Sequence, residues 1–520
     1  NLDLYKVLKG LSFRSQISTT LNSSRNGQYI GEHSLQGVEN GYSAPYAYIN
    51  NNYGYSYLWD NVLTYKIEPL KGHKVTLTGV TSYSHGQSDS NNMRASGQPL
   101  DSYLFYNMAS GITKYGVKSN YSQSQKMSYA LRLNYVYNDK YIASFTTRWD
   151  GASHLASGHK WESFPAGALA WRVSQEPFME STKKWLNNLK LRLSYGITGN
   201  SGGMGAYSSQ TGAATYSPVS IDGELSSVSQ LVSPYGNPSI GWEKTYQWNY
   251  GVDLGFFDGR INLSFDYYDS KTKDLLFSRT LPVTSAITAW GSPMATWQNI
   301  GETSNKGYEI QLSTVNVKSR NFQWSSSISY THNDEKIVDL PDGDLIAKKL
   351  FEGHPIKTFY DFKYAGIWST AEEEEAAKYG CQPGYVKIET VEQFTTDENG
   401  NLVGDGGVHT YSNTRDLQIL GSNVPDGILG VNNTFKYRDF DLSVFAIVRY
   451  GQMIDSKTIG WYSANGNNQP RGTNYWTPEN QSAYFPRPGI ASTTGIGSLK
   501  YIDGSYAKIK NITLGYTLPA

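Results

Sequence analysis

Residues 245–269, TYQWNYGVDLGFFDGRINLSFDYYD, decide how the rest of the chain is interpreted. Apolar side chains alternate with polar or glycine positions over 248–256, and the alternation resumes over 261–267. Asp258-Gly259, between the two runs, is a strong signal for a hairpin turn. The stretch therefore predicts two paired strands with one apolar and one polar face. In a soluble sandwich the apolar face would meet a protein core, whereas in an outer-membrane barrel it would meet lipid.

The composition favours the membrane alternative. Charged residues make up 17% of the 520 residues and aromatic residues 14%, whereas soluble domains carry about 25% charged residues. The 45 basic and 45 acidic side chains balance, which argues against a nucleic-acid partner because such partners select a basic surface. No apolar run of about 18 residues is present, so no helix is predicted to span a membrane. The single cysteine excludes an internal disulfide framework.

Strand patterns recur along the chain, and the connections between them are alternately short and long. The alternation is typical of outer-membrane barrels, whereas a Greek-key sandwich mixes connection lengths and a propeller repeats a motif every ~40–50 residues. We therefore predict an all-β fold, a transmembrane antiparallel β-barrel, with about 14 strands in this chain. The one good helical pattern in a short connection covers 176–186. The expected large extracellular loops lie near 22–56, 85–126, 198–246, 270–306, 333–427 and 450–504.

Several short motifs resemble the SusC/RagA family of TonB-dependent outer-membrane transporters of Bacteroidetes. They occur in the family's order from about residue 140 to the end of the chain, and the ordered set is much more specific than any one motif. The matching stretches are RWDGAS (148–153), WESFP (161–165), AWRVSQEPF (170–178), LRLSYGITGN (191–200), NPSIGWEK (237–244), NIGETSNKGYE (299–309), ILGSNVP (419–425), YRDFDLSVF (437–445) and YIDGSYAKIKNITLGYTLP (501–519).

The resemblance implies a 22-stranded barrel closed by an N-terminal plug. It also implies a TonB box that engages the TonB–ExbB–ExbD complex and a SusD-like surface lipoprotein over the extracellular mouth. Neither the plug nor the TonB box is found in this chain, which we expect to be an interior fragment of one such barrel. The implied location is the outer membrane, in contact with lipid, and the implied role is transport without bond chemistry.

Two groups of residues are candidates for contact with a solute. Aromatic side chains in the long polar loops could stack on a sugar ring or clamp a peptide, although they could equally pack the loops or the interface to the lid. Polar side chains opposite the apolar strand faces would line the lumen, where most would be ordinary wall residues. The loop aromatics are Trp290, Trp297, Trp461, Tyr462, Tyr475 and Trp476. The expected lumen-facing residues are Arg132, Asn134, Lys190, Arg192, Asn249, Asp253, Asn262 and Asp266.

A possible Ca²⁺ site is the weakest candidate. Asp397, Asn399 and Asp405 place oxygen ligands near glycine turns. The pattern fails the complete Ca²⁺-loop motif, because the twelfth position from Asp397 is Val408 rather than an acid. Asx turns explain the same residues. We therefore predict no cofactor, with Ca²⁺ as the alternative. A short acidic helix is expected over 371–379.

Three functions remain open. The first is TonB-dependent import of an oligomeric nutrient, a glycan or a peptide, as the channel subunit of a SusCD-like complex. The second is a TonB-dependent receptor for a siderophore or a vitamin. The third, from another class, is an outer-membrane adhesin or structural barrel without transport. No catalytic constellation can be assembled from the sequence, so an enzyme is not predicted.

Overall fold

The computed structural model describes residues 2–4, 7–216, 219–221, 224–226, 229–232, 235–282, 284, 288–289, 292–397, 401–460, 472–489 and 494–518. The chain divides into two compact units. The first comprises Asn1–Glu176, Arg192–Trp248 and Thr272–Ile300, and the second Pro177–Leu191, Asn249–Lys271 and Gly301–Ala520. In the part of the chain that is described, no helix has the length and apolar character needed to cross a membrane.

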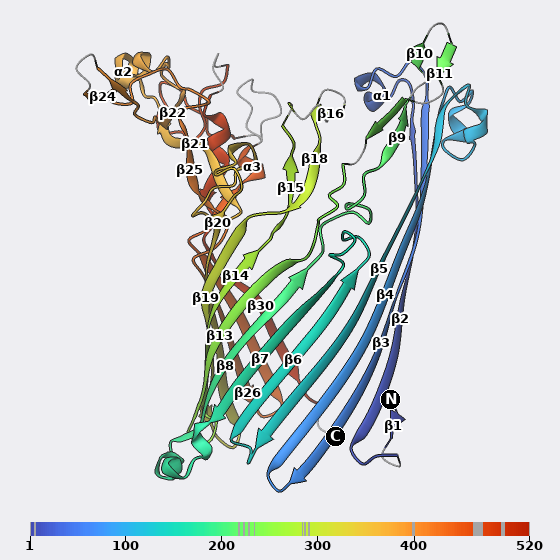
Figure 1. Ribbon diagram of the computed structural model, residues 1–520. Coiled ribbons are helices and arrows are strands. Elements are labelled where there is room, and N and C mark those ends of the chain that lie inside the picture. Colours follow the sequence, from blue (N-terminus) through green and yellow to red (C-terminus); the bar gives the residue numbers. More distant parts are fainter. Residues whose placement is uncertain are drawn as a thin grey trace. The chain divides into compact units, whose positions relative to one another are not determined.

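One antiparallel sheet contains the long strands of the chain (Figure 1). Its hydrogen-bonded order is β1-β2-β3-β4-β5-β6-β7-β8-β13-β14-β19-β20-β26-β27-β30. Apart from the two-residue β1, these strands agree with the predicted number. Their bounds are Leu2–Asp3 (β1), Leu11–Ile30 (β2), Tyr46–Leu70 (β3), His73–Ser96 (β4), Thr113–Tyr137 (β5), Tyr141–Ala152 (β6), Trp161–Arg172 (β7), Leu186–Asn200 (β8), Glu243–Phe256 (β13), Ile261–Lys273 (β14), Glu302–Lys318 (β19), Phe322–Asp339 (β20), Gly427–Tyr437 (β26), Phe440–Tyr450 (β27) and Tyr506–Tyr516 (β30).

The remaining elements lie in the connections. The short strands are Ala213–Tyr216 (β9), Val219–Ile221 (β10), Glu224–Ser226 (β11), Ser229–Val232 (β12), Leu276–Thr280 (β15), Thr288–Ala289 (β16), Ser292–Pro293 (β17), Ala295–Asn299 (β18), Thr358–Ile367 (β21), Val386–Glu389 (β22), Phe394–Thr396 (β23), Leu402–Gly404 (β24), Leu417–Ser422 (β25), Met453–Asp455 (β28) and Tyr501–Asp503 (β29). The α-helices are Leu35–Glu39 (α1), Glu373–Lys378 (α2) and Lys457–Gly460 (α3). The 3₁₀ turns are Asp101–Tyr103, Met108–Ser110, Val173–Gln175, Pro177–Thr182, Ile346–Lys348, Thr370–Glu372 and Ile496–Lys500.

The predicted hairpin turns are confirmed. Asp258 and Gly259 join β13 to β14 with φ angles of 55° and 80°. Asn138 and Asp139, at 50° and 56°, turn β5 into β6. Backbones with positive φ match the twist of the paired strands, and Asn, Asp and Gly tolerate them best. Local sequence therefore determines where these strands reverse.

The prediction that 22–56 and 85–126 form loops was wrong. β2 continues to Ile30 and β3 begins at Tyr46, while β4 continues to Ser96 and β5 begins at Thr113. The added strand length pairs along its whole course, for example Asn22 with Gly54 and Gly54 with Ser88. These segments lack apolar alternation because both of their faces are polar, so their sequence resembles loops. β3 has 25 residues, more than twice the ~9–11 that cross a bilayer.

The other four long connections lie near their predicted bounds, but they contain short paired strands of their own. The helix predicted at 176–186 was wrong, since that segment has a 3₁₀ turn at Pro177–Thr182 and then enters β8. Ser181 and Thr182 are weak helix formers, and the chain enters the sheet at Leu186, which leaves no length for a continuing helix. The acidic helix predicted at 371–379 is confirmed as the 3₁₀ turn Thr370–Glu372 followed by α2.

The strands expose apolar side chains that a soluble protein would bury. Trp248 and Tyr250 of the opening hairpin are 43% and 48% exposed. Large apolar residues are exposed in the same way at alternate positions of β5, Tyr129, Leu131 and Leu133. Such a surface suits contact with lipid rather than water. The buried clusters lie mainly in the connections, as described below.

Candidate functional site

The predicted polar face of the opening hairpin holds a connected group of side chains. Lys190 Nζ lies 3.6 Å from Asp253 Oδ2. Ser264 Oγ lies 3.0 Å from Asp253 Oδ1 and 3.3 Å from Asp266 Oδ2, so its one hydroxyl proton can be donated to either carboxylate. The structure thus brings Lys190, Asp253 and Asp266 together through Ser264. Ser264 occupies the same alternating polar face of the strand as Asn262 and Asp266.

Arg132, Asn134 and Asn262 of the expected lumen-facing set make local contacts. Arg132 Nε donates to Asn134 Oδ1 at 3.3 Å on β5, and Asn262 Nδ2 donates to Gly259 O at 2.8 Å. Arg192 and Asn249 lie on β8 and β13. These positions agree with a polar wall, and solute contact at any of them stays a prediction.

The predicted loop aromatics are in different environments. Trp297 lies on β18, opposite Ser278 of β15, and its carbonyl accepts from Asn237 Nδ2 at 2.8 Å. Tyr475 is 44% exposed, but Trp476 is only 3% exposed. The Trp476 ring packs closely against Gly384, so it belongs to a loop core rather than to a surface. Trp290, Trp461 and Tyr462 lie outside the described residues.

Two long connections fold together. We call the described residues of 340–426 and 451–505 the loop module. Thr370 N donates to Gln481 Oε1 at 3.0 Å. Arg487 N donates to Gly384 O at 3.0 Å, and the Arg487 guanidinium lies 5.5 Å from the centroid of the Tyr385 ring. Contacts across this sequence distance turn two long loops into one folded body.

An aromatic core stabilises the loop module. Trp368 is 2% exposed, and its Nε1 donates to Tyr411 Oη at 3.0 Å. Lys387 Nζ lies 4.2 Å from the centroid of the Trp368 ring, a cation–π contact, and 2.8 Å from Glu372 Oε1. Hydrogen bonds from Lys387 and Ser369 lower the pKa of Glu372 to about 2. Burial raises the pKa of Tyr411, which is therefore a neutral hydrogen-bonding group.

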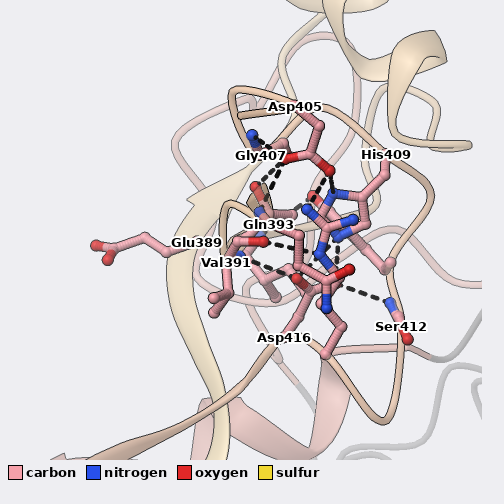
Figure 2. Close-up of polar contacts among 12 residues, drawn as sticks. Glu389, Val391, Gln393, Asp405, Gly407, His409, Ser412 and Asp416 are labelled. Atoms are coloured by element: carbon pink, nitrogen blue, oxygen red, sulfur yellow. Dashed lines mark hydrogen bonds and ion pairs between the residues drawn. The ribbon is translucent and has the colours of Figure 1, made fainter. Parts of the chain in front are cut away.

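A buried carboxylate organises the base of the β23–β24 hairpin (Figure 2). Asp416 is fully buried and accepts from His409 Nε2 at 2.9 Å, Val391 N at 2.9 Å and Ser412 N at 2.8 Å. In Figure 2 Glu389 points away from this group; it pairs instead with Lys363.

Arg415 forms the second half of the same network. Its guanidinium pairs with Asp405, and its Nε donates to Val391 O at 2.9 Å. Asp405 also accepts from Gln393 N at 3.0 Å and Gly407 N at 2.9 Å. The Arg415 guanidinium, followed by these amides, lowers the pKa of Asp405. The sequence offered no signal for this network, because its members are spaced irregularly in a loop.

The contacts of the Ca²⁺ candidates are those of turns. Asp405 is engaged as above, and Asp397 Oδ1 accepts from Asn401 N at 2.8 Å. Asn399 lies outside the described residues. Within the described ranges no group of three or more His, Cys, Asp or Glu side chains is placed to hold a metal ion. The Asx-turn alternative accounts for the observed contacts.

Comparisons with known proteins agree with this architecture. The family described as "TonB dependent receptor-like, beta-barrel" matches residues 3–358. TonB-dependent receptor P3 of Formosa agariphila is 30% identical, over 99% of this chain and 50% of its own length. TonB-dependent receptor SusC of Bacteroides thetaiotaomicron is 27% identical, over 96% and 48%. The chain therefore spans about half the length of these relatives.

A solved structure described as the RagAB peptide transporter superposes with a TM-score of 0.78 at 20% identity, covering 98% of this chain and 54% of that chain. At this identity the likeness establishes a shared fold. It agrees with the predicted resemblance to the SusC/RagA group. Because the family match extends over more than half of the sequence, the chain belongs to the TonB-dependent receptor-like β-barrels of the outer membrane, a family of receptors rather than enzymes.

Proposed function

We propose that the chain forms part of the barrel wall and extracellular surface of a transporter that imports an oligomeric nutrient, a glycan or a peptide, in a TonB-dependent manner. Its partners would be a SusD-like surface lipoprotein and, through a plug and TonB box elsewhere in the protein, the TonB–ExbB–ExbD complex. The similar proteins of Formosa agariphila and Bacteroides thetaiotaomicron are TonB-dependent receptors about twice as long as this chain, which supports a TonB-dependent role for the whole protein.

The observation that carries the proposal is the combination of exposed apolar strands with an ordered loop module. Outer-membrane barrels join their strands by short periplasmic turns and longer extracellular loops. Here two of the long connections form one body with its own buried core, including Trp368 and Tyr385. Binding residues are disproportionately found on loops that a rigid scaffold positions, which favours a receptor or transporter over a purely structural barrel.

Purification of the tagged full-length protein from its native outer membrane tests the proposal. We expect a surface lipoprotein to co-purify, and mass spectrometry of the eluted solute to give either an oligosaccharide series or a peptide ladder. Uptake of the identified solute should stop when tonB is deleted. A bound iron chelate or vitamin would favour the receptor alternative. Uptake that continues without TonB, or a complete chain without a plug, would refute the transport mechanism.

A further inference from the structure

A cavity of about 440 Å³ lies on one face of β5–β8. Cross-strand partners show which face: Ser128 pairs with Asp150, and Arg132 of the same strand pairs with Thr146. Paired residues in an antiparallel sheet point to the same side. The cavity therefore shares its face with Arg132, which the sequence predicts to face the lumen. Its volume falls in the range of about 300–1,000 Å³ that is usual for small-ligand pockets.

The accessible charge in this cavity is positive. Arg148 Nε donates to Asp150 Oδ1 at 2.7 Å, and Arg148 Nη2 donates to Ser128 Oγ at 2.9 Å. The Asp150 side chain is only 16% exposed, whereas that of Arg148 is 47% exposed. A guanidinium has five N–H donors, so donors of Arg148 remain available to an anion. Lys126 is exposed at the same cavity, and its ammonium has no acceptor among the residues that the structure describes.

The floor of the cavity is apolar and fixed. Phe164 and Trp242 are 6% and 8% exposed, and their rings meet edge to face with centroids 5.3 Å apart. Trp242 Nε1 donates to Lys160 O at 3.0 Å, which holds the indole in place. A Cβ at Gly199 would lie 2.0 Å from the Phe164 ring. Glycine at this position therefore keeps the aromatic floor in its observed position.

We propose that this β5–β8 cavity is a binding subsite for a carboxylate-bearing unit of the transported oligomer. The inference rests on the proposed function and names the chemistry of its solute. Arg148 and Lys126 would bind the carboxylate through charge-assisted hydrogen bonds, Ser128 and Thr146 border the site with hydroxyls, and the aromatic floor would pack against the apolar part of the unit. A uronic-acid oligosaccharide and an acidic peptide both supply this chemistry.

The test measures binding by isothermal titration calorimetry on the purified full-length complex in detergent. Tetragalacturonate and tetraglutamate serve as acidic probes, and maltotetraose is the neutral probe. Lys126→Gln removes one cation of the cavity without breaking a contact that the structure shows. Lys118→Gln is the matched control, since it lies on the same face of β5, eight residues away and outside the cavity.

We expect one acidic probe to bind the wild type, and Lys126→Gln to weaken that binding about tenfold, the value of one charged hydrogen bond. Lys118→Gln should bind as the wild type does. The probe that binds more tightly identifies the source of the carboxylate. Failure of both acidic probes to bind, equal binding of maltotetraose, or equal effects of the two substitutions would overturn the proposal. TonB-dependent uptake of the co-purified solute is measured separately, so a failed subsite can be distinguished from a failed transport function.

Discussion

Replacing Asp416 with alanine should unfold the base of the β23–β24 hairpin. The buried carboxylate accepts from His409 Nε2, Val391 N and Ser412 N, all within 2.8–2.9 Å. The substitution leaves three part-buried donors without this acceptor, and an unsatisfied buried donor costs about 1–3 kcal/mol. Water entering the space left by the carboxylate would satisfy some of them. We therefore expect local stability to fall by about 3–5 kcal/mol, as for other broken buried ionic contacts.

Native-state hydrogen exchange measures this loss directly, because the amides of Val391 and Ser412 are bonded to Asp416 itself. A loss of about 3–5 kcal/mol corresponds to an increase in exchange rate of about two to four orders of magnitude. Asp416→Asn keeps one acceptor oxygen in the same volume and should cause a smaller increase. Asp397→Ala, which removes a carboxylate bonded to Asn401, should leave both amides protected. Protection within threefold of the wild type in Asp416→Ala would refute the assigned role.

Three further outcomes follow from the structure. The topology can be tested by cysteine labelling with the buried native cysteine replaced by serine. Glu374→Cys should react with an impermeant maleimide on intact cells, whereas Arg320→Cys in the β19–β20 turn should react only after the outer membrane is opened. The reverse labelling pattern would show that the long loops face the periplasm. Lys387 lowers the folded-state pKa of Glu372 to about 2. The stability that the ionised Glu372 contributes should therefore be complete above pH ~4.5 and disappear as the pH falls toward 2. Thermal melting should show the difference in melting temperature between the wild type and Glu372→Gln shrinking over that pH range. Gly199→Val should displace the aromatic floor of the β5–β8 cavity and destabilise the protein by about 1–3 kcal/mol, visible as a lower melting temperature in detergent.

The strands could be predicted from sequence wherever apolar and polar residues alternate. The hairpin at Asp258-Gly259 has its turn and its faces encoded within 25 neighbouring residues, because strand pairing across a tight turn is a local event. The extension of β2 past Asn22 could not be predicted in this way. Serine and asparagine on both faces give no periodicity, and the backbone ladder to β3 that orders them is invisible in one strand taken alone.

The loop module was beyond prediction for a different reason. Its contacts join residues about a hundred positions apart, such as Thr370 and Gln481. The sequence indicated that Trp476 sits in a polar stretch, but not that Gly384 would cover its ring. Nothing in the spacing of His409 and Asp416 distinguishes a buried pair from two surface residues. Packing against distant segments determines these environments, and no local pattern reports it.

The position of the loop module nevertheless follows from the strands. The first of its two connections ends where β26 begins, at Gly427, and the second starts where β27 ends, at Tyr450; these two residues are direct partners in the sheet. The second connection returns to the sheet at Tyr506, which pairs with Arg449. Pairing of β26, β27 and β30 therefore brings three of the four connection ends together before the module forms. The entropic cost of closing a loop grows with the number of residues it encloses. Once the sheet has paired the strand ends, contacts between the two connections enclose fewer unfixed residues and cost less to form. Substitutions in the module should then leave the sheet intact, while loss of β27 pairing should abolish both.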